Sequence, residues 1–112
     1  MLNELVNTVN LTHSTASSEV HAACSDNLYF RVNRIELSVY KAAQGGSGIL
    51  EILSTLGEPM WIVNVDSVFN KTFDYGKKGV LIGQNVGVQA ILSGAQHQAS
   101  ISLCVVGRLS VD

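Results

Sequence analysis

The chain ends with QASISLCVVGRLSVD, residues 98–112, and this stretch decides the fold class. Its odd positions from residue 99 onward are apolar except for Gly107, and its even positions, from Ser100 to Asp112, are mostly polar. Side chains of a β-strand alternate between two faces, so this period of two indicates one long strand that covers a core on one side only. We therefore expect the strand to close one sheet of an all-β fold, and its polar face, which carries Cys104, to be a subunit contact.

The rest of the chain is a succession of short strand-like runs separated by turn clusters. We expect strands in residues 8–13, 19–24, 28–42, 48–56, 60–66, 67–75, 80–83 and 87–94. No apolar period near 3.6 residues predicts a long helix, although the first six residues, MLNELV, are compatible with one irregular or helical turn. Eight or nine strands at this spacing are typical of a two-sheet β-sandwich or a barrel.

The alternation slips inside the long run LYFRVNRIELSVYKA, residues 28–42. Phe30 and Val32 share one phase, whereas the apolar residues from Ile35 onward share the other. A one-residue shift would turn every following side chain to the wrong face, so we predict a bulge or bend at Asn33 and Arg34.

Composition and charge limit the classes of protein that fit. The 112 residues are enough for one domain, and only 14% of them are charged, against about one-quarter in an average soluble domain. The net charge is −2 and the seven basic residues are scattered, which disfavours binding to nucleic acid. Because strand edges without charges invite pairing with another chain, we expect subunits to cover part of this surface.

No segment indicates a membrane or a secretory route. No apolar run approaches the roughly 18 residues that a bilayer span needs, and the start, MLNELVNTVN, lacks the basic and apolar regions of a signal peptide. We expect a soluble chain, without a membrane partner, that is synthesised in a cytoplasm.

No metal-binding motif is present. His13, His21 and His97 are far apart, and none has a second ligand type at metal-ligand spacing. Two cysteines, Cys24 and Cys104, are too few for a disulfide framework, and we expect small buried side chains, with the subunit contact as the alternative for Cys104.

No catalytic motif is present either. Asp66, Ser67 and His97 lack the GxSxG elbow of a hydrolase, and the scattered carboxylates are expected to solvate the surface. The carboxylate pairs considered are Glu51 with Asp66 and Glu58 with Asp74. We therefore expect no catalytic, cofactor or metal site, and a protein that is not an enzyme.

Two glycine-rich stretches are expected to be connections. QGGSG, residues 44–48, opens no helix and therefore lacks phosphate-binding geometry, and GKKG, residues 76–79, predicts a solvent-exposed tight turn. Trp61 is in phase with Val63 and Val65, so we expect it in the core, with a sugar-stacking platform as the alternative.

Residues 19–112 resemble small virion proteins of tailed bacteriophages, of the capsid decoration (cement) type. The similarity lies in three stretches: RVNRIELSVYKAAQGGSGILEIL, GEPMWIVNVDSVFNKTFDYGKKGVLIG and GVQAILSGAQHQASISLCVVGRL. The resemblance implies a single antiparallel β-sandwich domain, jelly-roll-like, with about eight strands. Residues 1–18 depart from the sandwich pattern, and we interpret them as an N-terminal arm or edge strand.

The same resemblance implies a function without a catalytic site. It predicts a non-enzymatic bacteriophage structural protein that is a homo-oligomer, with a trimer favoured over a dimer. Its partner would be the major capsid protein, and its location would be the capsid surface of the virion. Two alternatives stay open: a tail or baseplate accessory protein, and a carbohydrate- or receptor-binding module that uses Trp61 or Tyr75.

Overall fold

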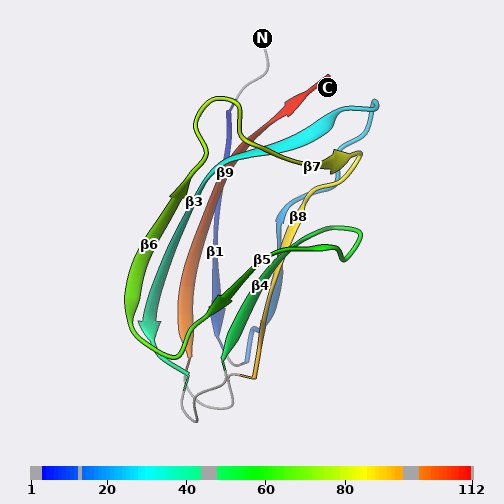
Figure 1. Cartoon of the computed structure of the whole chain (residues 1–112). Coiled ribbons are helices and arrows are strands. Elements are labelled where there is room, and N and C mark those ends of the chain that lie inside the picture. Colours follow the sequence, from blue (N-terminus) through cyan, green and yellow to red (C-terminus); the bar gives the residue numbers. More distant parts are fainter. Residues whose placement is uncertain (1–3, 13, 44–47, 95–98, 112) are drawn as a thin grey trace.

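A computed structural model describes residues 4–12, 14–43, 48–94 and 99–111, and these form nine β-strands and no helix (Figure 1). The strands are β1 (Glu4–Thr12), β2 (Ser17–His21), β3 (Tyr29–Lys41), β4 (Ile49–Ser54), β5 (Pro59–Asn64), β6 (Phe69–Asp74), β7 (Val80–Gln84), β8 (Val88–Ser93) and β9 (Ser100–Ser110). The described part of the chain thus contains no helix long and apolar enough to span a membrane.

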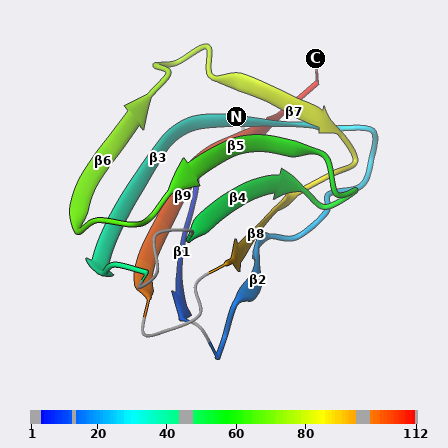
Figure 2. The same ribbon diagram turned by 60° about the horizontal axis from the view of Figure 1, so that its bottom comes forward.

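The strands form two antiparallel sheets that face each other, which confirms the predicted sandwich (Figure 2). One sheet has the order β1-β9-β3-β6, with β7 also paired to β3, and the other has the order β2-β8-β4-β5. Strands β6 and β7 pair with successive parts of β3, so together they act as two halves of one strand. When β6 and β7 are counted as one strand, the eight strands have the order of a jelly roll in the two sheets.

The core lies between the sheets and is built from the alternation that the sequence displays. In β9 the side chains of Ile101, Leu103 and Val105 are completely buried, and their neighbours Ser102 and Cys104 are half-buried on the outer face. Burying apolar side chains on one face of each strand removes them from water, which is the main stabilising term of a sandwich. One face of the final strand therefore covers the core, as predicted.

Two positions of β9 have special packing. A Cβ atom on Gly107 would lie 2.4 Å from the carbonyl oxygen of Arg31 and 2.9 Å from the ring of Phe30, so only glycine fits where the apolar series is interrupted. Val106, predicted on the polar face, is fully buried because it lies between Val6 of β1 and Arg34 of β3.

The predicted bulge in β3 is confirmed. The register between β3 and β9 shifts between Val32 and Arg34, and the buried phase changes there from Phe30 and Val32 to Ile35. The extra residue, Asn33, lets one strand keep its apolar side chains in the core on both sides of the shift.

The N-terminal segment begins with a strand. The irregular or helical turn expected in MLNELV is wrong for residues 4–6, because β1 begins at Glu4 and pairs with β9 over its whole length. Its inward side chains include Leu11, which is fully buried. Of the two interpretations of residues 1–18, the described part contains an edge strand, and residues 1–3 lie outside the described ranges.

Candidate functional site

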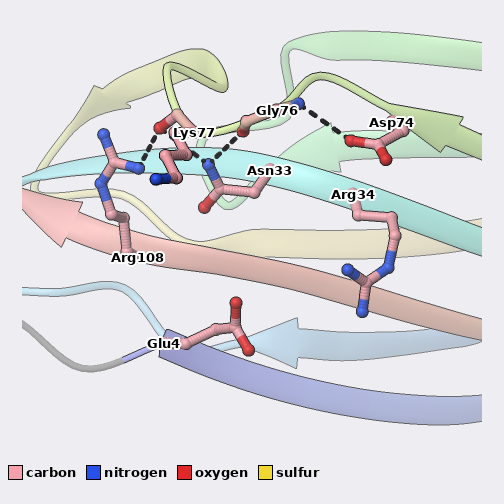
Figure 3. Close-up of a pocket in the computed structure, with 7 residues that line it drawn as sticks. All are labelled: Glu4, Asn33, Arg34, Asp74, Gly76, Lys77 and Arg108. Carbon is pink, nitrogen blue, oxygen red and sulfur yellow. Dashed lines mark hydrogen bonds between the residues drawn. The ribbon is translucent and has the colours of Figure 1, made fainter.

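A pocket of about 310 Å³ opens on the outer face of the β1-β9-β3-β6 sheet, close to the turn that joins β6 and β7 (Figure 3). Four elements contribute to it: β1, β3 with its bulge, β9, and the end of β6 with the following turn. The lining residues are Glu4, Asn33, Arg34, Asp74, Gly76, Lys77 and Arg108.

The β3 bulge fastens the β6–β7 turn that forms one wall of this pocket. The side-chain amide of Asn33 donates hydrogen bonds to the carbonyl oxygens of Gly76 (2.8 Å) and Lys77 (3.2 Å), and the backbone N–H of Tyr75 donates to the Asn33 carbonyl (2.8 Å). Arg108 of β9 also donates to the Lys77 carbonyl oxygen. The turn is exposed, as predicted, but it is held by side chains from two strands.

Gly79 lets this turn lie close to β3. Its φ is +69°, and a Cβ atom there would approach the Val32 carbonyl oxygen to 2.8 Å. A residue with a side chain would therefore meet both backbone strain and a steric clash. The second glycine of GKKG is thus needed for the close approach of the turn to β3, which the composition alone does not reveal.

Three cationic side chains, Arg34, Lys77 and Arg108, share the pocket with two carboxylates, Glu4 and Asp74. The cations are not neutralised by those carboxylates within the described ranges. The ion pair recorded there joins Arg34 Nε to Glu36 Oε2, at 3.4 Å and in exposed positions, and Asp74 Oδ1 accepts a hydrogen bond from the Gly76 backbone N–H. The residues that line the pocket therefore carry one net positive charge, and Glu36, outside the lining, pairs with Arg34.

Two rows of mostly short, uncharged side chains lie on this outer face, and we call them the polar face; Arg31 and Lys41 are on the same side of the sheet but outside these rows. Two rows cross the sheet from β1 to β6 in register, and Glu36 is the charged residue among them. The rows are Asn10–Ser102–Ser38–Asn70 and Thr8–Cys104–Glu36–Thr72. Cys104 is half-buried in the second row and is not part of a disulfide.

The outer face of the second sheet carries an apolar group that we call the isoleucine face: Ile49, Ile62 and Ile91. Ile62 of β5 and Ile91 of β8 lie directly opposite Glu51 of β4, one on each side, and Ile49 lies two residues from Glu51 on the same strand. Ile62 leaves 66% of its surface exposed. Apolar side chains gathered on one open sheet face are a feature shared by surfaces that contact another protein.

The structure brings Trp61 and Tyr75 together. The indole Nε1 of Trp61 donates a 2.7 Å hydrogen bond to the Tyr75 hydroxyl oxygen, and the ring centroids are 6.0 Å apart with a 43° tilt. Trp61 is half-buried and packs against the core rather than lying completely inside it. The two rings hold each other at an angle, so they do not form one flat stacking surface.

His21 is buried between the sheets and forms part of a polar link. Its Nε2–H donates to the Val105 carbonyl oxygen (2.9 Å), and its Nδ1 accepts from the Asn7 side-chain amide (3.1 Å), which also donates to the Val20 carbonyl (2.6 Å). This pattern satisfies both ring nitrogens of a neutral imidazole. Burial lowers the pKa of His21 from 6.5, and the hydrogen bond to Val105 partly opposes this effect.

The remaining candidate side chains that the structure describes do not assemble into a site. His13 and His97 lie outside the described residues, so the arrangement of Asp66 and Ser67 with His97 is not tested by the structure. Asp66 accepts a 2.8 Å hydrogen bond from the Gly48 N–H, and Asp74 lies in the pocket with Glu4 rather than with Glu58. The described residues hold no group of three or more metal-ligating side chains.

Residues 44–47 of the QGGSG connection lie outside the described residues. Cys24 lies near the β7–β8 connection. Cys24 is half-buried rather than fully buried, and its Sγ lies 3.4 Å from the carbonyl oxygens of Leu28 and Val86. The expectation of a small side chain in the interior is therefore met only in part.

The chain was compared with protein families, curated proteins and solved structures. No family model matches the chain, and no curated protein matches it. Among solved structures, the chain is similar to a protein described as "Cyanophage Pam1 capsid asymmetric unit". The TM-score is 0.48 and the sequence identity 10%, over 96% of this chain and 85% of that chain.

Proposed function

We propose that this chain is a non-enzymatic structural protein of a tailed bacteriophage, a decoration subunit that binds between major capsid proteins on the outer surface of the head. The resemblance of residues 19–112 to small virion proteins supplies the class of particle. The protein is synthesised in the host cytoplasm, assembles as a homotrimer and is located in the virion, without a nucleic-acid or membrane partner.

The isoleucine face is the observation that carries this proposal. Exposed apolar side chains on an open sheet face are costly in water unless a partner covers them. Ile62 and Ile91 flank Glu51 in register, so the face offers apolar contact area around a single negative charge. A shell protein that presents an arginine or lysine among apolar side chains complements this arrangement.

The polar face is assigned to the contact between subunits. Its two rows hold Glu36 as their charged residue, and charge depletion is typical of the centre of a protein interface. Cys104 and Ser102, on the central strand β9, lie in the middle of these rows. Many weak contacts of this kind become strong when they are repeated over a capsid lattice.

The experiment is co-sedimentation of the purified chain with heads of the phage that encodes it, from which the native copies have been removed. We expect saturable binding by the wild type and by Val68→Lys, and binding weakened at least about tenfold by Ile62→Lys. Ile62 and Val68 are equally exposed, at 66%, but Val68 lies in the β5–β6 connection, outside the isoleucine face. Equal binding by the two variants would contradict the assignment of the face.

A carbohydrate-binding module remains the second candidate, because Trp61 and Tyr75 lie together at the surface. Sugar stacking on this pair would quench tryptophan fluorescence, and Tyr75→Phe would keep the ring while removing the hydrogen bond to Trp61. A glycan array with no hit and no quenching by any sugar would exclude this function and leave the structural role.

A further inference from the structure

We propose that the pocket beneath the β6–β7 turn binds one carboxylate group of a ligand, held by Arg34, Lys77 and Arg108. The carboxylate is carried either by a free organic acid or by an acidic side chain of a protein partner. This inference goes beyond the proposed virion role and does not depend on it, because it rests on the geometry and charge of the pocket alone.

The first argument is that the pocket is a built feature. Its wall is the β6–β7 turn, which is pinned by two hydrogen bonds from Asn33 and one from Arg108. Asn33 is in place to make those bonds because β3 bulges there. Bulges that redirect a side chain are over-represented next to functional sites.

The second argument is that cationic donors line the pocket from more than one side, and the carboxylates of the lining do not form ion pairs with them in the described residues. Arg34 uses its Nε for a 3.4 Å contact with Glu36, which leaves its two terminal nitrogens as donors for a ligand. Arg108 donates one of its five N–H groups to the Lys77 carbonyl oxygen. Figure 3 shows the Arg34 and Arg108 side chains at separate sides of the pocket, with Glu4 near its β1 border. Planar guanidinium groups bind carboxylates through two parallel hydrogen bonds.

The third argument concerns the size of the ligand charge. The side chains that line the pocket, three cations and two carboxylates, sum to one positive unit, and Glu36, which pairs with Arg34, lies outside the lining. Exposed ion pairs of this kind are weak, so one ligand carboxylate can replace Glu36 at Arg34 and match the charge of the lining. Glu4 and Asp74 would repel a doubly charged phosphate more strongly than a single carboxylate. A volume of about 310 Å³ is at the small end of ligand pockets and accommodates a side chain or a short organic acid.

The test is a titration of the ¹⁵N-labelled full chain at constant ionic strength, read from the backbone amides of Gly76 and Lys77. The probes are acetate, succinate, inorganic phosphate, and the peptide acetyl-Gly-Glu-Gly-amide with its glutamine counterpart. We expect saturable shifts with the carboxylate probes and none with the glutamine peptide. Tighter binding of the glutamate peptide than of succinate assigns the carboxylate to a protein partner, and the reverse order assigns it to a free acid.

Matched variants locate the binding. Arg34→Gln and Lys77→Gln should each weaken carboxylate binding about tenfold, whereas Lys78→Gln, the neighbouring turn position outside the pocket, should change it less than about twofold. Within the described residues, Arg34 donates its Nε to Glu36 and not to the turn, so its variant keeps the wall intact. Absence of saturable binding, tighter binding of phosphate than of every carboxylate, or an equal loss in Lys78→Gln would overturn the proposal.

Discussion

Acidification should destabilise the sandwich through His21. The folded state keeps this imidazole neutral, since its Nδ1 accepts a hydrogen bond from Asn7, which a proton at that atom would abolish. Burial lowers the folded pKa below 6.5, and the bond to the Val105 carbonyl raises it in part. The side chains that face His21 within the described ranges, Asn7 and Phe30, do not titrate.

The sign and size of the effect follow from linkage. Between the unfolded pKa of 6.5 and the lower folded value, the unfolded chain binds more protons, so stability falls as pH decreases through that window and is flat above it. One proton corresponds to at most about 1.4 kcal/mol per pH unit. If His21 stays neutral when folded, the loss of unfolding free energy from pH 7.5 to 5.5 is about 1.4 kcal/mol.

The assay is urea unfolding of wild type and His21→Gln at several pH values, so that His13 and His97 contribute equally to both proteins. The pH-dependent difference between the two proteins should equal the loss assigned to His21. Asn7→Asp provides a second check, because a carboxylate facing Nδ1 favours the imidazolium, raises the pKa of His21, and should reduce or reverse the slope. Identical pH dependence in wild type and His21→Gln would refute the reasoning.

Three further predictions follow from the packing and the surfaces. Gly107→Ala should lower the free energy of unfolding in urea by about 1–3 kcal/mol, because the added Cβ meets the Arg31 carbonyl oxygen and the Phe30 ring. Gly83→Ala, whose Cβ meets only the Val86 side chain, should lower it less. Deletion of residues 1–9 should lower the midpoint of thermal unfolding, because it removes most of β1 and the Asn7 bonds to β2; an unchanged midpoint would be inconsistent with an integral edge strand. Light scattering after size exclusion should give three times the 12.0 kDa chain mass over a dilution series. The variant Ser102→Lys, in the centre of the polar face, should give the monomer mass. A trimer that survives Ser102→Lys would place the subunit contact elsewhere.

The sequence allowed the sandwich to be predicted because local alternation reports which face of a strand is buried. The phase of Ile101, Leu103 and Val105, and the slip at Asn33, are properties of neighbouring residues, and both are found in the structure. The start of β1 was missed because Val6, apolar on the outer face, and Asn7, polar on the inner face, reverse the expected alternation. Asn7 is inward-facing, where it bonds to His21 and Val20.

The pocket could not be predicted, because its residues come from distant parts of the chain. Glu4 and Arg108 face each other through the β1–β9 register, and the β6–β7 turn reaches them only because β6 and β7 pair with the same strand. The one available signal was the coincidence of a bulge at Asn33 with a lysine-containing turn. The isoleucine face was hidden for a similar reason, since Ile49, Ile62 and Ile91 meet only after three strands pair.

The most direct test of the proposed role is to find where the chain resides in the particle. Heads and tails of the phage that encodes it would be separated on a density gradient, and the copies of the chain per particle would be counted by quantitative mass spectrometry against the major capsid protein. The account predicts that the chain is found with heads, at a fixed ratio to the shell subunit. Recovery with tails alone, or absence from purified particles, would contradict it.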